Sequence, residues 1–329
     1  ASMHKAITPS MAACRVLVPP LTSSAYKGQA GKVGVVGGCA EYTGAPFYAA
    51  LSALKLGADL SHIFCDAPAA IPIKGYSPEL IVHGCLRSGE MNEADQQRQA
   101  DEVCKWFPAL SALVVGPGLG RDPALQAVAA LVVERAVSMS LPLVIDADGL
   151  QLVNQRPELV RGSPWTVLTP NKPEYARLLG ALGQAKQPSI AGETTALDED
   201  FELRELACSL QGPTIVRKGP VDYISDGTTI IENAEPGCPK RSGGQGDVLA
   251  GSIATFLSWA RAAGPRLPAD GPPAPVLAAY TACVLTRRFS AAAFARQRRA
   301  MTAPDLIESI GPVIESFAPA DGTRPKEVQ

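Results

Sequence analysis

A glycine-rich turn that ends in one acidic residue is the segment of this sequence best suited to chemistry. It covers Arg241 to Asp247, Arg-Ser-Gly-Gly-Gln-Gly-Asp, and apolar residues recur at helical spacing after it. The glycines therefore precede a predicted helix, where free backbone N–H groups and the helix dipole favour an anion such as a phosphate. A carboxylate in that place would repel the anion. The conflict is resolved if Asp247 takes a proton from a hydroxyl while the N–H groups hold the phosphoryl group that the hydroxyl attacks.

Structural roles and other nucleotide motifs are the alternatives for this segment. The glycines could form a plain turn, with Asp247 placed only to favour a helix N-terminus; the Gly-Gly-x-Gly-Asp order favours the phosphate-binding interpretation. The sequence contains no Walker A pattern. Gly116-Pro117-Gly118-Leu119-Gly120 follows an apolar run but lacks the GxGxxG spacing of a dinucleotide fingerprint. It predicts a strand-end loop that lines a pocket, or a tight turn without a ligand.

The composition is typical of a globular protein and gives no reason to expect a polyanionic partner. The chain has 329 residues, of which 46% are hydrophobic, and a net charge of -2. That charge provides no basic field for nucleic acid or an anionic membrane, and no apolar run approaches the ~20 residues of a membrane span. The 8 cysteines are scattered without metal-ligand spacing, so we expect reduced thiols. The three histidines (His4, His62, His83) are expected to have structural roles.

The terminal segments bear on domain organisation and location. We expect residues 1–16 to be a flexible N-terminal segment, 17–317 a single domain and 318–329 a flexible tail. The cysteine usage indicates a cytoplasmic protein. Residues 4–15 contain no acidic residue, as in organellar transit segments, so a mitochondrial form is the alternative.

Strand-like and helical runs alternate along the chain and predict the α/β class. The predicted strands are 31–36, 60–65, 79–83, 112–115, 142–146, 166–169 and 214–218; the predicted helices are 45–56, about 90–107, about 123–138, 173–179 and 203–210. This alternation indicates a mostly parallel central sheet with helices on both faces. Ligands then belong at the carboxyl ends of the strands. The loops at 37–38, 116–120, 146–148, 169–174 and 218–219 all follow predicted strands.

Several short motifs, in their order along the chain, resemble one family. They are Lys27–Gln29, Gly34–Gly38, Glu41–Pro46, Val115–Gly120, Ile145–Asp148, Leu168–Asn171 with Glu174, and the Gly-Gly-Gln-Gly-Asp loop. The chain resembles the ATP-dependent (S)-NAD(P)H-hydrate dehydratases of the eukaryotic type, which belong to the ribokinase-like superfamily. The resemblance extends from about Leu17 to Gly311. It implies a ribokinase-like fold and a repair reaction, in which hydrated NADH or NADPH (NADHX, NADPHX) returns to the working cofactor while ATP becomes ADP and phosphate.

The resemblance also implies the residues of the site. Asp247 would be the catalytic base, and ATP and Mg²⁺ would be the cofactors. The hydrated cofactor would contact Gly118, Asn171, Lys172, Pro173, Glu174, Tyr175, Ala176, Arg177 and Asp247. ATP would contact Lys218, Gly219, Pro220, Val221, Asp222, Gly237, Cys238, Pro239, Lys240, Arg241, Ser242, Gly243, Gly244, Gln245 and Gly246. Without the resemblance, Asn171 and Glu174 indicate helix capping; Glu174 could also hold Mg²⁺ through water.

Other readings of the sequence remain open. A small-molecule kinase of the same superfamily would show the same loop and base but would release a phosphorylated compound, and a nucleotide-binding regulator without catalysis belongs to a different class. Lys218-Gly219 leads to Asp226-Gly227, which predicts a hairpin turn that could cover a nucleotide. Relatives form oligomers, so a homo-oligomer is expected from the resemblance alone. The preference between NADHX and NADPHX does not follow from the sequence.

Overall fold

The computed structural model describes residues 8–183 and 196–320 and contains one nine-stranded sheet. The strands are β1 (Lys32–Val36), β2 (Leu60–Asp66), β3 (Ile81–Leu86), β4 (Ala112–Val115), β5 (Leu143–Ile145), β6 (Thr166–Leu168), β7 (Thr214–Arg217), β8 (Asp222–Ser225) and β9 (Ile230–Asn233). The helices are α1 (Met11–Val16), α2 (Gly44–Leu56), α3 (Ala67–Tyr76), α4 (Glu93–Cys104), α5 (Pro123–Ser138), α6 (Leu150–Gln155), α7 (Lys172–Ala181), α8 (Ala196–Leu210), α9 (Gln245–Ala263), α10 (Ala274–Gln297) and α11 (Ala303–Phe317).

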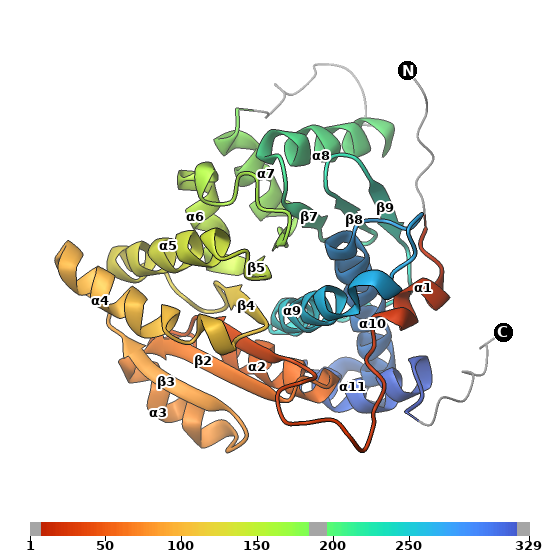
Figure 1. Ribbon diagram of the computed structural model, residues 1–329, viewed down its shortest axis with the longest axis horizontal. Coiled ribbons are helices and arrows are strands. Elements are labelled where there is room, and N and C mark those ends of the chain that lie inside the picture. Colours follow the sequence, from red (N-terminus) through yellow and green to blue (C-terminus); the bar gives the residue numbers. More distant parts are fainter. Residues whose placement is uncertain (1–7, 184–195, 321–329) are drawn as a thin grey trace.

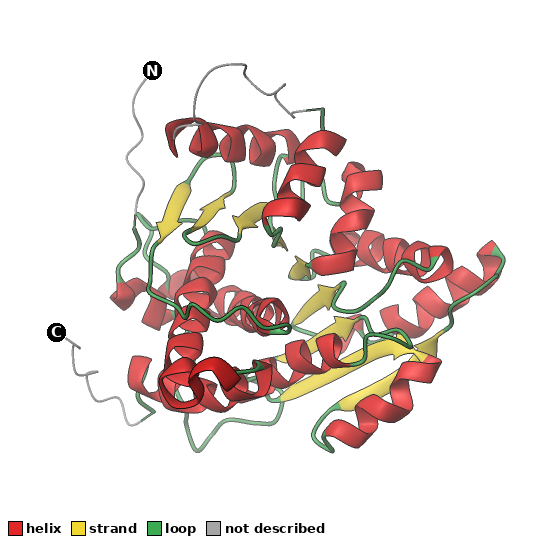
Figure 2. Cartoon of the chain, turned by 180° about the vertical axis from the view of Figure 1, so that it is seen from behind, coloured by secondary structure: helices red, strands yellow, loops and turns green. Residues whose placement is uncertain are grey.

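The sheet order is β3-β2-β1-β4-β5-β6-β7-β8-β9, with helices outside both faces (Figures 1 and 2). All pairs from β3 to β7 are parallel, whereas β7–β8 and β8–β9 are antiparallel. The predicted α/β class with a mostly parallel sheet is therefore confirmed. Asp226 accepts hydrogen bonds from Thr228 N and Thr229 N in the predicted β8–β9 turn. Because the parallel strands share one direction, the loops after β1, β4, β5, β6 and β7 meet at the same edge.

Alternate residues of the central strands face two separate hydrophobic cores. On β4, Val114 packs in the core that contains α2, α9 and α10, while Leu113 and Val115 pack in the core that contains α5 and α6. β5 repeats the pattern, with Val144 on the first side and Leu143 on the second. Such strands are apolar on both faces, as expected for parallel strands covered by helices on both sides. The sheet is thus the rigid base from which the loops project.

Besides the short helices α1 and α6, three longer helices have no counterpart among the predicted elements. They are α3, α10 and α11, which cover residues 67–76, 274–297 and 303–317. α3 contains Pro68 near its start and Pro72 inside, and proline is unfavourable in a helix interior. Asp66 caps the helix by accepting a hydrogen bond from Ala67 N at 3.0 Å. α8 also starts earlier than the predicted helix, at Ala196, while α5 has the predicted bounds.

The N-terminal residues 11–16, which were expected to be flexible, form helix α1. Ser10 caps it, and Cys14 is buried in the core beside α10. Arg15 Nε donates a hydrogen bond to the carbonyl oxygen of Phe317, which joins the helix to the end of α11 at 2.9 Å. The ordered part of the chain therefore includes Met11–Val16, because this helix buries a core side chain. Residues 321–329 of the expected tail lie outside the described residues.

Two of the three histidines, His62 and His83, lie in the described residues and pack together, while His4 lies outside them. His62 Nδ1 and His83 Nε2 lie 3.1 Å apart on neighbouring strands, with their rings stacked and beside Trp106. Burial and the adjacent His83 lower the pKa of His62 to about 4, and burial also lowers the pKa of His83, so both rings are neutral at physiological pH. All 8 cysteines lie in the described residues as free thiols. Among the described helices, none is long and apolar enough to cross a bilayer.

Gly116, at the end of β4, is predicted to tolerate no side chain. Its φ is +123°, and a Cβ would lie 2.5 Å from Gly149 N and collide with the Asp146 carbonyl oxygen. We expect Gly116→Ala to lower the free energy of unfolding by at least about 2 kcal/mol, because both the backbone and the space disfavour alanine. Denaturant titration measures this. Gly89→Ala is the control, since φ there is +93° but nothing lies within 4 Å of a Cβ; an equal loss in both variants would show that the collision is irrelevant.

Candidate active site

The N-terminus of α9 and the loops at the carboxyl ends of the strands surround a cavity of about 930 Å³. Of the residues predicted to contact the hydrated cofactor, Gly118 and Asp247 line it. Gly118 has a φ of +62°, and a Cβ there would meet Tyr42 O at 2.5 Å, so the loop depends on glycine at this point. The wall also contains residues that were not among the predicted substrate contacts: Glu41, Tyr42, Asp66, Ser88, Arg121 and Asp122.

Asp247 lies in the first turn of α9, as the sequence predicted. The helix begins after Gly244, which caps it in the left-handed conformation with a φ of +89°. Burial and then the nearby negative charge of Asp146 raise the pKa of Asp247 to about 7, although Lys218 opposes this rise. A carboxyl group with such a pKa is a suitable proton acceptor at neutral pH. The adjacent residues Gln245 and Gly246 line a different cavity, so the helix N-terminus lies between the two.

An ammonium group lies beside this turn. Lys218 Nζ is 2.8 Å from Asp146 Oδ1, and Thr169 Oγ1 donates to the same oxygen at 2.7 Å. Burial would lower the pKa of Lys218, but the carboxylates of Asp146 and Glu174 outweigh it and raise the pKa. Lys218 therefore remains charged next to Gly246, where a phosphate would meet both its ammonium group and the helix N-terminus.

The second cavity, of about 330 Å³, collects most of the residues predicted to bind ATP. Those that line it are Lys218, Gly219, Pro220, Asp222, Gly237, Cys238, Arg241, Gln245 and Gly246. The other predicted residues are their sequence neighbours Val221, Pro239, Lys240, Ser242, Gly243 and Gly244. Gln245 fixes the loop, because its Nε2 donates to Lys240 O at 3.0 Å and to Ser242 Oγ at 3.1 Å.

Helix α10 supplies a residue of this cavity that sequence reasoning missed. Arg287 Nε lies 2.7 Å from Asp222 Oδ2, and its other nitrogens donate to the carbonyl oxygens of Gly219 and Pro220 at 2.9 and 2.8 Å. Asp222 in turn accepts from Gly219 N and from Asn233 Nδ2. One guanidinium thus shapes the wall formed by the loop after β7. Residues 274–297 were not among the predicted helices, so no local pattern in the sequence pointed to Arg287.

The segment 171–177 contains both capping and core residues. Asn171 and Glu174 form a complete capping box at the start of α7, with bonds of 3.0 and 2.8 Å to each other's backbone N–H. Tyr175 is buried in the core on the α5 side of the sheet. Lys172, Pro173, Ala176 and Arg177 are exposed. None of these residues lines the cavity of Asp247, so the structure brings only Gly118 and Asp247 of the predicted substrate set together there.

The sequence of nearly the whole chain matches one family. The profile described as NAD(P)H-hydrate dehydratase matches residues 33–312. The chain belongs to the NAD(P)H-hydrate dehydratase family. Relatives named ATP-dependent (S)-NAD(P)H-hydrate dehydratase include one from Bos taurus, 47% identical over 91% of this chain and 86% of the relative. One from Physcomitrium patens is 43% identical over 92% of this chain and 94% of the relative.

Solved structures with low sequence identity share the fold of this NAD(P)H-hydrate dehydratase family member. The ADP/ATP-dependent NAD(P)H-hydrate dehydratase of Bacillus subtilis, co-crystallized with ATP/Mg²⁺, aligns with a TM-score of 0.65 and 19% identity, over 96% of this chain and 100% of that one. A ribokinase-like superfamily protein of Enterococcus faecalis aligns with a TM-score of 0.71 and 21% identity, over 94% and 96%. The ribokinase-like fold is therefore confirmed.

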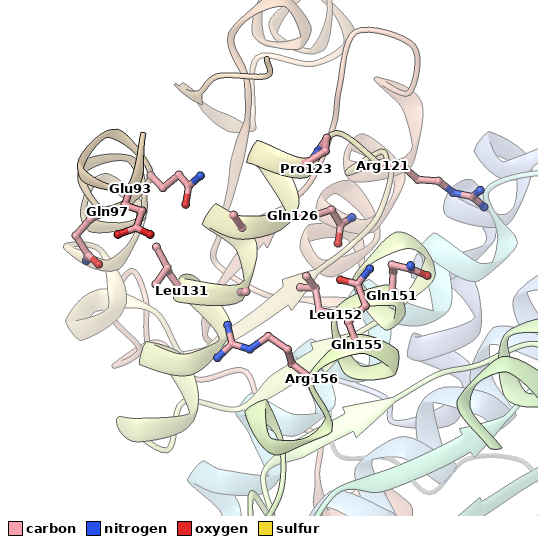
Figure 3. A pocket seen from close by; sticks show the side chains of 13 residues that line it. Glu93, Gln97, Arg121, Pro123, Gln126, Leu131, Gln151, Leu152, Gln155 and Arg156 are labelled. Carbon is pink, nitrogen blue, oxygen red and sulfur yellow. The ribbon is translucent and has the colours of Figure 1, made fainter. Parts of the chain in front are cut away.

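A further pocket of this dehydratase family member lies between α4, α5 and α6 (Figure 3). Its volume is about 620 Å³, and amide side chains such as Gln97, Gln151 and Gln155 surround it. Neither Asp247 nor the glycine-rich loop lines it. Gln126 lies at its wall and donates to the carbonyl oxygen of Gly120 at 2.7 Å, so α5 supports the loop that follows β4. The pocket is therefore adjacent to the Asp247 cavity and distinct from it.

Proposed function

We propose that this chain repairs hydrated NADH and NADPH by ATP-dependent dehydration, with Asp247 as the general base. One observation carries the proposal: neighbouring residues at the start of α9 line two cavities. Gly246 faces the smaller one together with Lys218, and Asp247 faces the larger one. A phosphoryl donor and a hydroxyl acceptor can then approach the same helix N-terminus from two sides, which is the geometry that phosphoryl transfer requires.

The chemistry follows from the charges at this helix N-terminus. The Asp247 carboxylate takes the proton of the hydroxyl on the hydrated nicotinamide ring, and the oxygen attacks the γ-phosphorus of ATP as the bond to ADP breaks. Lys218 and the N–H groups of Gly244 to Gly246 stabilise the negative charge on the phosphoryl oxygens. The lone pair of the ring nitrogen then expels phosphate, and loss of a proton from the neighbouring carbon forms the ring double bond. The products are the working cofactor, ADP and phosphate.

The residues present fit a phosphate-bound Mg²⁺. Mg²⁺ keeps several waters and typically needs one or two carboxylates besides the phosphates of a nucleotide. Within the described residues, no group of three or more His, Cys, Asp or Glu side chains is placed to hold a metal ion by itself. The phosphates of a bound nucleotide would supply the other metal ligands. Glu174 is close enough to Lys218 to raise its pKa, and it would hold the ion through water. Bound there, Mg²⁺ would neutralise charge on the phosphate oxygens.

A direct assay tests the proposed reaction. The protein is mixed with Mg²⁺, ATP and chemically hydrated NADH, and the near-ultraviolet absorbance of the dihydronicotinamide is followed together with phosphate release. Equal formation of NADH and phosphate is expected. ADP formation without recovered absorbance would contradict dehydration and favour a small-molecule kinase. Parallel assays with hydrated NADPH compare the two substrates.

The pH dependence of this reaction should report Asp247. A proton acceptor must be ionised, and the pKa of Asp247 is about 7. We therefore expect kcat/KM for hydrated NADH to rise tenfold per pH unit below about pH 7 and to level off above it. Asp146→Asn removes a negative charge that raises this pKa, so the rise should move to lower pH. A profile of the unmodified protein that is flat from about pH 5 to about pH 8 would contradict the assigned base.

A further inference from the structure

The wall of the Asp247 cavity contains one positively charged side chain, that of Arg121, among the described residues that line it. Five acidic residues share the wall: Glu41, Asp66, Asp122, Asp148 and Asp247. Arg121 is exposed and forms no hydrogen bond or ion pair within the part of the chain that the structure describes. Its charge is therefore available to a ligand of the cavity.

The acidic neighbours of Arg121 are occupied by the protein's own donors. Asp122 Oδ1 accepts from Ala124 N and its Oδ2 from Gly89 N, both at 3.0 Å. Asp148 Oδ2 accepts from Gly120 N at 3.0 Å, and Asp66 accepts from the backbone and hydroxyl of Ser88. These bonds fix the carboxylates in place and hold them to helix N-termini and loops. They leave the guanidinium of Arg121 as the group in the wall that attracts an anion.

The position of Arg121 fits an anion that lies away from the reacting ring. The residue follows Gly120 directly and precedes Asp122, which caps α5. It belongs to the rim that the Asp247 cavity shares with the amide-lined pocket. In Figure 3 its side chain extends away from Gln126, Gln151 and the other residues of that pocket. Arg121 thus follows a residue whose backbone is fixed, because Gly120 N donates to Asp148 and Gly120 O accepts from Gln126.

We propose that Arg121 binds the pyrophosphate group of the hydrated dinucleotide substrate, an inference that rests on the proposed function. The ring that reacts must lie at Asp247, so the charged pyrophosphate must be placed elsewhere in the same cavity. Among five carboxylates, a pyrophosphate is stabilised only beside the cation. The planar guanidinium can donate two parallel hydrogen bonds to phosphate oxygens.

Steady-state kinetics test this role. We expect Arg121→Gln to raise KM for hydrated NADH about tenfold or more, with kcat and KM for ATP within about twofold of the unmodified protein, because the lost contact is made equally in the ground and transition states. Arg121→Lys should recover part of the loss, since the charge remains but the forked geometry does not. Arg156→Gln is the matched control: this exposed arginine lines only the amide-lined pocket and already pairs with Glu158 at 3.1 Å.

Binding of NADH, the expected product, separates this inference from the proposed reaction. Fluorescence titration of NADH without ATP should give a Kd about tenfold or more higher for Arg121→Gln than for Arg156→Gln. Wild-type-like NADH binding and KM in Arg121→Gln would overturn the role of Arg121 while leaving the reaction intact. A loss of kcat alone, with KM and Kd unchanged, would also overturn it. Absence of dehydration in the unmodified protein would instead overturn the proposed function, and the titration would still measure Arg121.

Discussion

Asp247→Asn is expected to lower kcat by at least about 10²-fold and to leave ATP binding close to that of the unmodified protein. The amide keeps the size of the side chain but cannot accept the hydroxyl proton at neutral pH. ATP binding should persist because its cavity is lined by Gly246 and Lys218 and not by Asp247. Because the substitution removes the negative charge of Asp247 near the phosphates, any change in ATP affinity should be an increase. Single-turnover kinetics and an ATP titration measure the two quantities separately.

The control for this variant is Asp305→Asn. Asp305 is also an acidic residue in the first turn of a helix, α11, where it accepts a hydrogen bond from Thr302 N at 2.7 Å. The substitution repeats any effect of losing a carboxylate at a helix N-terminus, about 1 kcal/mol of stability, but lies outside both cavities. Activity should stay normal there. A normal turnover number in Asp247→Asn would refute the assignment of the base.

Lys218→Met should have the second large effect, on both ATP use and stability. The substitution removes the ammonium from the nucleotide cavity, so kcat/KM for ATP should fall by about 10²-fold or more. It also leaves Asp146, whose side chain is only 3% exposed, without its ion-pair partner, which typically costs about 3 kcal/mol or more. Loss of the cation also raises the pKa of Asp247 further, so the activity that remains should need a higher pH.

A double variant separates these consequences of losing Lys218. Lys218→Met with Asp146→Asn replaces the unpaired carboxylate by a neutral amide, so stability in denaturant titrations should return toward that of the unmodified protein. The low kcat/KM for ATP should persist, because the cation is still absent. Recovery of ATP use together with stability would show that Lys218 acts only through folding and has no role at the phosphates.

The sequence predicted those parts of the fold in which one local rule dominates. α5 begins at the predicted residue because Asp122 caps it and Pro123 occupies its first position, and its apolar residues keep a helical spacing. α3 was missed since Pro72 lies inside it, although the cap at Asp66 and the packing of Ile73 in the core outweigh that cost. Tertiary packing, which no local rule reports, determined this element.

In the candidate site, too, the sequence predicted residues that belong to a local motif and missed those that tertiary structure brings to the cavities. Asp247, Lys218 and the glycine-rich loop belong to contiguous motifs, so their chemistry could be predicted from residue type and order. Arg121 and Arg287 are single residues that the topology brings to the cavities, from the start of α5 and from α10. Spacing along the chain contains no information about such contacts. In the predicted substrate segment 171–177, Asn171 and Glu174 form the capping box that the sequence also indicated, and Tyr175 is buried in the core.

The bonds of Arg287 join the wall of the proposed nucleotide cavity to a late part of the chain. The loop after β7 forms this wall, and its Asp222 is bound by Arg287, which lies 65 residues later in the sequence. A nascent chain that has emerged only as far as α9 has the glycine-rich loop and Lys218, but the carbonyl groups of Gly219 and Pro220 still lack their donor. Synthesis of α10 completes the pocket. The donor that completes this wall is therefore synthesised after every strand of the sheet, because β9 ends at Asn233 and α10 begins at Ala274.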